Sequence, residues 1–339
     1  MNTNVSATAK PSTQPFQFKS VKELYEAPSE SISYVVEGLL PSSGLSVLAG
    51  KPKAGKSTLA RQLGVAVAQG IPFLGRETEQ GEVMYLALEE KESEVAAHFR
   101  TLGLDLADPL VTVCGAVPRN HALINLELAF KNRPETKLVI IDPFFRFVGG
   151  VKDSNDYIQV NNALEPLLTL ARNYGVHIVI VHHMKKVSTE DVMDGVLGST
   201  AIAAAVDTHI AVNVKQGGIR TISTRQRYGF DLNESLLHWD ADKRSLTIGM
   251  SCQAAEEHAQ GATRHRIEAD ITKYVADHEN CTREAILDSV TGNVPVKKQV
   301  LRELIDNDTI RRHGTGKKGD PYTFNLTPIP VEAPEFVEP

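Results

Sequence analysis

Cysteine is scarce in this chain, and its spacing excludes two classes of small stabilised domain. The 339 residues contain three cysteines, Cys114, Cys252 and Cys281, an odd number spread far apart. None stands in a Cys-x-x-Cys pair or in a Cys/His spacing typical of zinc ligands, so a disulfide framework and a zinc finger are both excluded. We expect reduced thiols and a cytoplasmic protein.

Long apolar runs and an excess of positive charge are also missing. No uninterrupted apolar stretch approaches the ~20 residues of a membrane span, and the first 18 residues, MNTNVSATAKPSTQPFQF, lack the apolar segment of a secretory signal. We therefore expect a soluble protein with no membrane partner. The net charge is -6, so any contact with nucleic acid has to come from local basic patches.

Apolar residues are nevertheless abundant, at 42% of the chain, enough for one large α/β core and a satellite. From Leu45 onward, short β-branched runs alternate with helix-period segments, which predicts a mostly parallel sheet with helices on both faces. After Asp207, the runs THIAVNV, IRTISTR and SLLHWDADKRSLTIG predict antiparallel strands that extend this sheet. The predicted organisation is a disordered tail (1–25), an α/β domain (26–250), a linker (251–263), a small domain (264–327) and a flexible tail (328–339).

One loop has the residues of a phosphate-binding loop. Residues 50–57, GKPKAGKS, match G-x-x-x-x-G-K-[ST] without a gap, between the apolar run LSVLA and a segment with Leu59, Leu63 and Val67 at helical spacing. In such a loop the backbone N–H groups surround a phosphate, the lysine reaches the β- and γ-phosphates, and the hydroxyl ligates Mg²⁺. The predicted ligands are ATP and Mg²⁺, held by Gly50, Lys53, Ala54, Gly55, Lys56, Ser57 and Thr58.

Carboxylates follow two other apolar runs. Asp142 ends the run LVII, which places it at the carboxyl edge of a buried parallel strand, where such sheets bind ligands. We interpret it as a second support of Mg²⁺. Glu89 ends VMYLAL and is interpreted as the group that orients the attacking water. Glu90, Glu92 and Glu94 leave open the alternative that this acidic segment is only the first turn of a helix.

Taken in order, the motifs resemble those of the RecA-like hexameric P-loop ATPases, and among them the RepA-type replicative helicases of plasmids and phages. The resemblance covers roughly residues 34 to 230, and it depends on the order and spacing of the motifs rather than on any single later one. The motifs are YVVEGLLPSSGLSVLAGKPKAGKST, VMYLALEE, KLVIIDPFFRFVGGVKDSNDYIQV, VHIVIVHHMKK, GVLGSTAIAAAVDTHIAV and TRQRYG.

This resemblance implies roles for residues at three strand ends. The catalytic glutamate of the family corresponds to Glu89 and its Walker B aspartate to Asp142. The polar γ-phosphate sensor of the next strand corresponds to His183, with His182 as the alternative. Adjacent strand residues point to opposite faces, so the two histidines are not expected to share a metal ion.

The segment RQRYG, residues 225–229, is similar to the Lys-x-Arg-aromatic-Gly element with which RadA- and DnaB-like rings complete a neighbour's ATP site. It implies that Arg227 acts in trans as an arginine finger and that Arg225 also faces the nucleotide. Arg225 stands where many relatives have lysine, which leaves its role open. A pair of surface arginines on an exposed strand is the alternative.

The resemblance further implies a homo-oligomer, a hexamer in the family, with single-stranded DNA in its central channel. Residues 149–157 and 184–198 correspond to the segments that line that channel. Candidates for phosphate contact are Arg146, Lys152, Lys185 and Lys186. Acidic neighbours weaken this interpretation, and ordinary solvated loop charges are the alternative.

The C-terminal segment 264–327 predicts three helices followed by two short strands, a pattern that resembles a winged helix-turn-helix. Helical spacing predicts a first helix over 264–279, and the next two over 282–290 and 295–307. Strands over 309–312 and 322–325 follow. Such a module would offer duplex DNA the basic residues Lys297, Lys298, Arg302, Arg311, Arg312, Lys317 and Lys318. Docking of a protein partner is the alternative.

The sequence thus predicts a Mg²⁺-dependent ATPase that acts on DNA as a ring, with replicative-type helicase as the leading function. One alternative is a DNA-bound ATPase that does not translocate, such as a recombination mediator or replication regulator. Another is an ATP-gated assembly protein whose C-terminal module binds protein.

Overall fold

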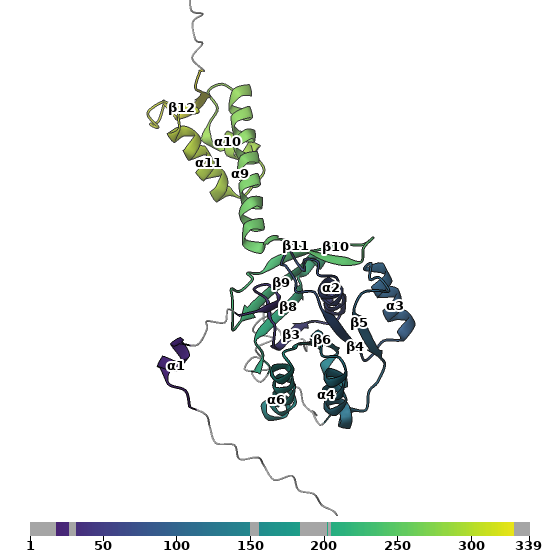
Figure 1. The fold of residues 1–339 in the computed structure, drawn as a ribbon. Coiled ribbons are helices and arrows are strands. Elements are labelled where there is room, and N and C mark those ends of the chain that lie inside the picture. Colours follow the sequence, from purple (N-terminus) through teal and green to yellow (C-terminus); the bar gives the residue numbers. More distant parts are fainter. Residues whose placement is uncertain (1–17, 27–31, 150–155, 184–201, 203–204, 329–339) are drawn as a thin grey trace, which may run out of the picture.

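The computed structural model describes residues 18–26, 32–149, 156–183, 202 and 205–328. Within them, nine strands form one sheet in the order β11-β10-β9-β8-β3-β7-β6-β4-β5 (Figure 1). The six strands from β8 to β5 run parallel, and β9, β10 and β11 extend the sheet in antiparallel pairs. The predicted mostly parallel α/β core is therefore confirmed. The strands are β3 (Gly44–Gly50), β4 (Glu82–Ala87), β5 (Leu110–Cys114), β6 (Thr136–Asp142), β7 (His177–His183), β8 (Thr208–Val214), β9 (Arg220–Gln226), β10 (Ser235–Asp240) and β11 (Ser245–Ser251).

Strand β8 corrects one expectation for the residues after Asp207. It pairs parallel with β3 and antiparallel with β9, so the direction changes one strand later than the sequence predicted. The 24 residues 184–207 separate β7 from β8, a length that permits a parallel crossover, whereas the short turns that follow permit only hairpins.

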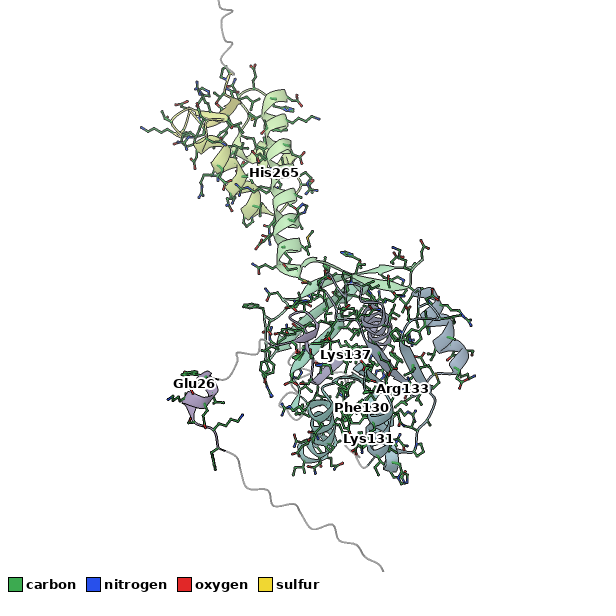
Figure 2. The ribbon with its side chains drawn as sticks, viewed as in Figure 1. Glu26, Phe130, Lys131, Arg133, Lys137 and His265 are labelled. Atoms are coloured by element: carbon green, nitrogen blue, oxygen red, sulfur yellow. The ribbon has the colours of Figure 1, made fainter. Side chains whose placement is uncertain are left out.

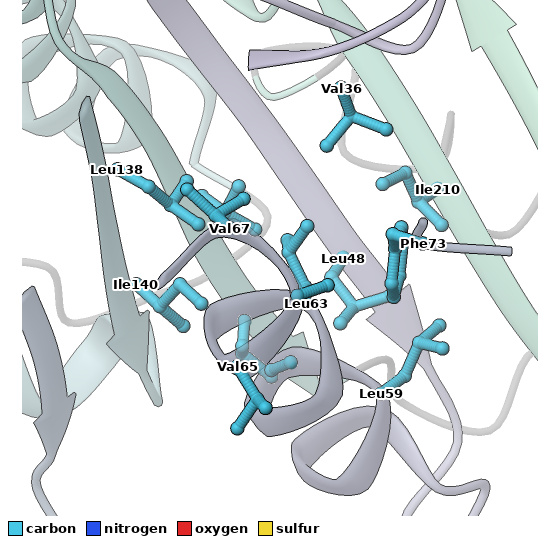
Figure 3. Packing of buried hydrophobic residues seen from close by; sticks show 14 of the residues in the cluster. Val36, Leu48, Leu59, Leu63, Val65, Val67, Phe73, Leu138, Ile140 and Ile210 are labelled. Carbon is cyan, nitrogen blue, oxygen red and sulfur yellow. The ribbon is translucent and has the colours of Figure 1, made fainter. Parts of the chain in front are cut away.

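Helices cover both faces of the sheet (Figure 1). On one face, the apolar stripe of α2 is buried as its spacing predicted, with side chains such as Leu63 packed against Leu48 and Ile140 (Figure 3). On the other face, the rings of Phe130 and Tyr174 lie 5.2 Å apart between α4 and α6 (Figure 2). The first face carries α2 (Lys56–Gln69) and α3 (Glu92–Thr101), and the second carries α4 (Ala122–Asn132), α5 (Phe144–Phe147) and α6 (Tyr157–Tyr174).

The C-terminal residues form a separate unit with its own apolar core (Figure 1). Ile267, Ile271 and Val275 of its first helix are buried, as their spacing predicted. The bounds of its last four elements lie within one residue of those expected, while a winged-helix fold stays a prediction. The elements are α9 (Cys252–Asp277), α10 (Arg283–Ser289), α11 (Val294–Asp306), β12 (Ile310–His313) and β13 (Thr323–Leu326).

Residues 251–263, predicted as a linker, are instead the start of α9. The hydroxyl of Ser251 accepts a hydrogen bond from the Ala254 N–H at 3.1 Å and so caps the helix. The following residues are rich in Ala, Glu and Gln, which have high helix propensity and need no apolar stripe to stay helical. The connection is therefore a helix continuous with the C-terminal unit.

The N-terminal tail predicted over 1–25 is corrected over its last residues, since helix α1 spans Val21–Glu26. Ser20 and Glu23 exchange side-chain to backbone hydrogen bonds, a capping box that starts this short helix. All of its residues are exposed. Strands β1 (Tyr34–Val36) and β2 (Leu40–Pro41) follow as a separate two-stranded ribbon.

No helix in the described part of the chain combines the length and apolar character that a membrane crossing requires.

Candidate active site

The loop between β3 and α2 has the backbone curvature that a phosphate cradle needs. Lys53 and Gly55 have φ angles of 65° and 104°, in the left-handed region. A Cβ on Gly50 would lie 2.2 Å from the carbonyl oxygen of Val212, so the start of the loop is closed to larger residues. The chain then enters α2 at Lys56, with backbone N–H groups of the first turn unpaired within the helix. The loop and helix start thus form an anion site.

Lys56 lies inside this loop and is 3% exposed. Its ammonium donates hydrogen bonds to the carbonyl oxygens of Gly50 and Lys51, both at 2.9 Å. Burial lowers the pKa of Lys56 to about 8, and the nearby Asp142 carboxylate opposes that shift. Near neutral pH the side chain is therefore a buried cation whose charge an incoming phosphate would stabilise.

Asp142 stands at the end of β6, beside the loop, and is 6% exposed. One carboxylate oxygen accepts a hydrogen bond from the Tyr85 hydroxyl at 3.0 Å. Burial and the neighbouring Asp142 charge raise the pKa of Tyr85 well above its usual value, so this phenol remains a donor. Ser57 lines the cleft next to Lys56. A hydroxyl and a carboxylate are oxygen ligands that suit Mg²⁺, which completes its coordination with phosphate oxygens and water.

Two adjacent glutamates follow β4, and the structure gives them different partners. Glu89 is half-exposed and forms an ion pair with Arg146 of α5, with 2.7 Å between Oε1 and Nε. Glu90 pairs with Arg61, a buried residue of α2. Burial raises the pKa of Glu90, although the Arg61 charge opposes the shift. Glu90 is thus committed to the helix, and Glu89 is the carboxylate at the cleft.

The two histidines at the end of β7 lie on opposite faces of the sheet. His183 lines the cleft with Lys56 and Ser57, on the face covered by α2. His182 is 8% exposed on the other face, where its ring meets Phe145 at 5.2 Å between centroids. Burial lowers the pKa of both, that of His182 to about 4. Both rings are therefore neutral near pH 7, and His183 is the one placed to meet a phosphate.

Three residues complete the cleft that no sequence motif indicated. Arg220 at the start of β9, Trp239 of β10 and Leu246 of β11 form its other wall, in a space of about 290 Å³. The side-chain amide of Gln62 in α2 holds this wall, since it donates to the Leu246 carbonyl at 2.8 Å and accepts from the Leu246 N–H at 2.9 Å. The signal in the sequence was weak, because it consisted of the single tryptophan of the chain.

Another cavity, of about 360 Å³, lies between β5 and α4. Its lining is mostly apolar, and it contains none of the residues of the loop. We do not associate it with phosphate chemistry.

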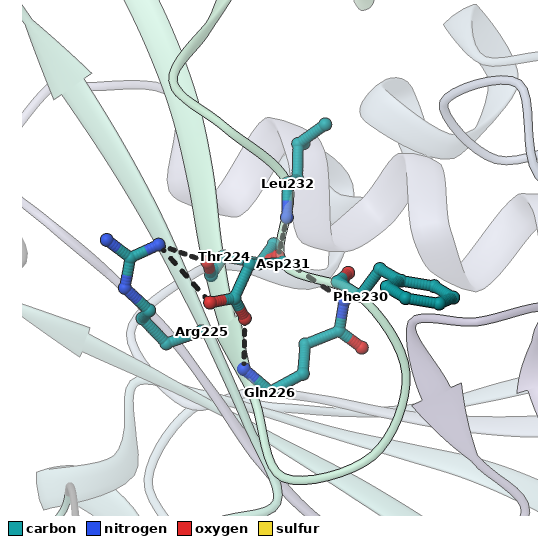
Figure 4. Close-up of polar contacts among 6 residues, drawn as sticks. All are labelled: Thr224, Arg225, Gln226, Phe230, Asp231 and Leu232. Atoms are coloured by element: carbon teal, nitrogen blue, oxygen red, sulfur yellow. Dashed lines mark hydrogen bonds and ion pairs between the residues drawn. The ribbon is translucent and has the colours of Figure 1, made fainter.

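The structure does not bring Arg225 and Arg227 to the loop of their own chain. Arg227 contacts Asp207, at 3.5 Å between Nη1 and Oδ1, and Asp207 in turn accepts the backbone N–H of Leu45 at 3.1 Å. Leu45 begins β3, whereas the loop follows the end of β3, so the finger segment is about 20 Å away along the strand. Arg225 pairs with Asp231 at 3.4 Å and holds the turn after β9 (Figure 4).

Of the residues predicted to contact nucleic acid, Lys152, Lys185 and Lys186 lie outside the described residues. Arg146 is engaged by Glu89. Lys297 is a correction: it is 8% exposed, and its ammonium donates to the carbonyl oxygens of Leu287 and Val290 at the end of α10. Because its charge serves the packing of two helices, Lys297 does not face a ligand.

The remaining basic residues of the C-terminal unit are at its surface. Arg311 forms two hydrogen bonds with Asp308, and the guanidinium of Arg312 lies 4.4 Å from the centre of the Tyr322 ring. The other exposed basic residues among those predicted to contact nucleic acid are Lys298, Arg302, Lys317 and Lys318.

The fold and the loop define the class of this protein, a P-loop ATPase. A family model described as AAA domain (AAA_25) matches residues 11–189, more than half of the 339 residues, and the chain therefore belongs to that family. A solved structure described as the ATPase domain of another protein resembles the chain with 12% sequence identity and a TM-score of 0.49, over 67% of this chain and 95% of that one. No curated protein matches the sequence.

Proposed function

We propose that this ATPase acts on DNA as a ring of identical subunits, and that it is a helicase of the replicative type. The observation that carries the proposal is the position of Arg227, about 20 Å from the loop of its own chain. A cation that stabilises the transition state at that loop then has to come from a neighbouring copy. Hydrolysis and assembly are coupled in such an arrangement.

Within one site, the residues have separate roles. Lys56 and the loop backbone bind the β- and γ-phosphates, Ser57 and Asp142 hold Mg²⁺, Glu89 orients water, and His183 contacts the γ-phosphate. When bound, Mg²⁺ neutralises part of the phosphate charge. Arg227, and with it Arg225, faces the nucleotide of the adjacent subunit.

The exposed basic residues of the C-terminal unit support a DNA partner. Lys298, Arg302, Lys317 and Lys318 lie on a chain whose net charge is -6, so their clustering runs against the composition of the whole protein. We assign duplex DNA to this unit and single-stranded DNA to the ring channel.

The test measures steady-state ATPase activity with and without single-stranded DNA, together with subunit mixing. We expect DNA to stimulate turnover, and Arg227→Ala to bind ATP without hydrolysing it. Mixing Arg227→Ala with Lys56→Ala restores part of the activity, because one mixed interface then has an intact loop and an intact finger. Absence of rescue, in rings shown to exchange subunits, removes the trans role of Arg227.

Turnover that ignores DNA at every concentration points instead to the assembly protein with a docking module. Stimulation by DNA without strand separation points to the ATPase that does not translocate.

A further inference from the structure

The wall of the cleft formed by β9, β10 and β11 lies on the side of the loop away from the metal ligand. In the sheet order, β7, β6 and β4 lie to one side of β3 and carry His183, Asp142 and Glu89 at their ends. Strands β8 to β11 lie to the other side. A nucleotide whose γ-phosphate points toward Asp142 therefore has its sugar and base over β9 to β11.

This wall presents an aromatic ring and a cation at two different heights. The Arg220 Nε lies 4.0 Å, and the Leu246 Cδ1 3.3 Å, from the position a Cβ on Gly55 would take, so both contact the level of the phosphates. Trp239 pairs with Leu246 in the β10–β11 register and is 44% exposed. Its indole is available to a flat ligand group.

The position of the ring is held from below by the Gln62 amide, which bonds to both backbone groups of Leu246. Leu246 itself is 1% exposed. The aromatic wall is thus attached to the same helix that begins at the phosphate loop, and its distance from bound phosphates is fixed by α2.

We propose that Trp239 is the platform on which the base of the nucleotide stacks, and that the site accepts purine and pyrimidine triphosphates alike. Stacking uses the π face that every base has, so it favours no base strongly. Among the described residues that line this wall, Arg220 lies at the phosphate level, and Leu246 has no polar side chain. The inference deepens the ATPase assignment and rests on the phosphate site at Lys56.

Trp239 is the single tryptophan of the chain, so its fluorescence reports directly on the platform. The full-length protein is titrated with ATP, GTP, CTP and UTP, and with inorganic tripolyphosphate as a ligand that has no base. We expect all four nucleotides to quench the emission with affinities within about tenfold of each other. Tripolyphosphate binds, as calorimetry detects, with little quenching.

Calorimetry of Trp239→Ala separates stacking from structure. We expect roughly tenfold weaker binding of ATP with unchanged binding of tripolyphosphate, and partial recovery in Trp239→Phe. His238→Ala is the matched control, since His238 is the adjacent exposed residue of β10 and points to the other face.

Equal loss of ATP and tripolyphosphate affinity in Trp239→Ala overturns the platform, because the ring would then only support the fold. Strong preference for one base overturns the substrate class. If the parent protein binds neither ligand, the phosphate site itself fails, an outcome that calorimetry on Lys56→Ala and the parent distinguishes from the first two.

Discussion

Among single residues, Lys56 and Glu89 have contacts that predict opposite defects. Lys56 is buried within the loop, so Lys56→Ala removes a phosphate contact and weakens nucleotide binding. Glu89 stands at the cleft without being part of the loop, so Glu89→Gln keeps ATP bound and lowers turnover by about a hundredfold or more. Equilibrium binding and single-turnover hydrolysis measure the two effects.

Glu90 provides the comparison for this experiment. Because Glu90→Gln weakens the pair with buried Arg61, we expect a loss of roughly 2 kcal/mol in the free energy of unfolding, with turnover largely kept. Thermal denaturation and the ATPase rate of both variants separate the roles. Parent-like turnover in Glu89→Gln moves the base to Glu90 or elsewhere.

The lowered pKa of Lys56 predicts a pH dependence of ATP binding. With a pKa of about 8 in the free protein, the side chain is mostly neutral at pH 9, and bound phosphates favour its charged form. Binding at that pH therefore takes up a proton, and ATP affinity falls as the pH rises above 8.

Calorimetry in two buffers of different ionisation enthalpy measures this uptake. At pH 6.5 Lys56 is already protonated, so its contribution disappears there. His183→Gln should retain the uptake at pH 9. Equal uptake at both values of pH contradicts the assignment to Lys56.

Sequence motifs were sufficient for the residues at the ends of parallel strands. Asp142 and His183 end apolar runs, and parallel strands bring their carboxyl ends to one edge of the sheet without further information. Arg220 and Trp239 reach the same cleft through antiparallel pairing. Strand order and register in that part of the sheet depend on packing with α2, which no local motif encodes.

At the scale of elements, Lys297 links α10 to α11 rather than facing a partner. Lys297→Ala leaves the carbonyl oxygens of Leu287 and Val290 without this donor, so we expect the C-terminal unit to lose about 1–3 kcal/mol of stability. Lys298, its neighbour on α11, is exposed and serves as the matched control.

Thermal denaturation and DNA binding distinguish the two lysines. Lys298→Ala should leave the melting temperature unchanged and reduce the salt dependence of duplex binding by about one phosphate contact. A stable Lys297→Ala variant with weakened DNA binding restores the original assignment of Lys297 to DNA.

The helix bounds in the C-terminal unit could be predicted because apolar spacing marks each buried stripe. The start of α9 could not, because its first half buries no apolar residue: the buried positions begin only at Ile267. A helix exposed on all sides has no periodic signal. Its composition alone, in residues with high helix propensity, indicates its structure.

For the whole molecule, the separate apolar cores predict that the two parts fold independently. The cluster around Ile271 and Leu301 shares no residue with the clusters on the main sheet. Truncation before Ala255 should therefore leave the ATPase core folded and active in nucleotide binding. Affinity for duplex or forked DNA should fall, and its salt dependence should become less steep, because fewer phosphate contacts release fewer counterions.

A salt titration of binding, for the full-length and truncated proteins on duplex and single-stranded DNA, checks this expectation. Binding to single strands should change less, since it is assigned to the ring channel. Unchanged slopes on both substrates would mean that the unit does not contact the DNA backbone, and the protein-docking alternative would take its place.

The junction between β11 and α9 has a mechanical consequence. Strand β11 ends at Ser251 and α9 begins at Cys252 with no residue between them, while Gln62 joins β11 to the helix that follows the phosphate loop. The 26 residues of α9 extend for about 39 Å. Such a rod acts as a lever: a tilt of about 5° at its base moves its far end by roughly 3 Å. A small shift of α2 during the ATPase cycle would thus reach the C-terminal unit enlarged.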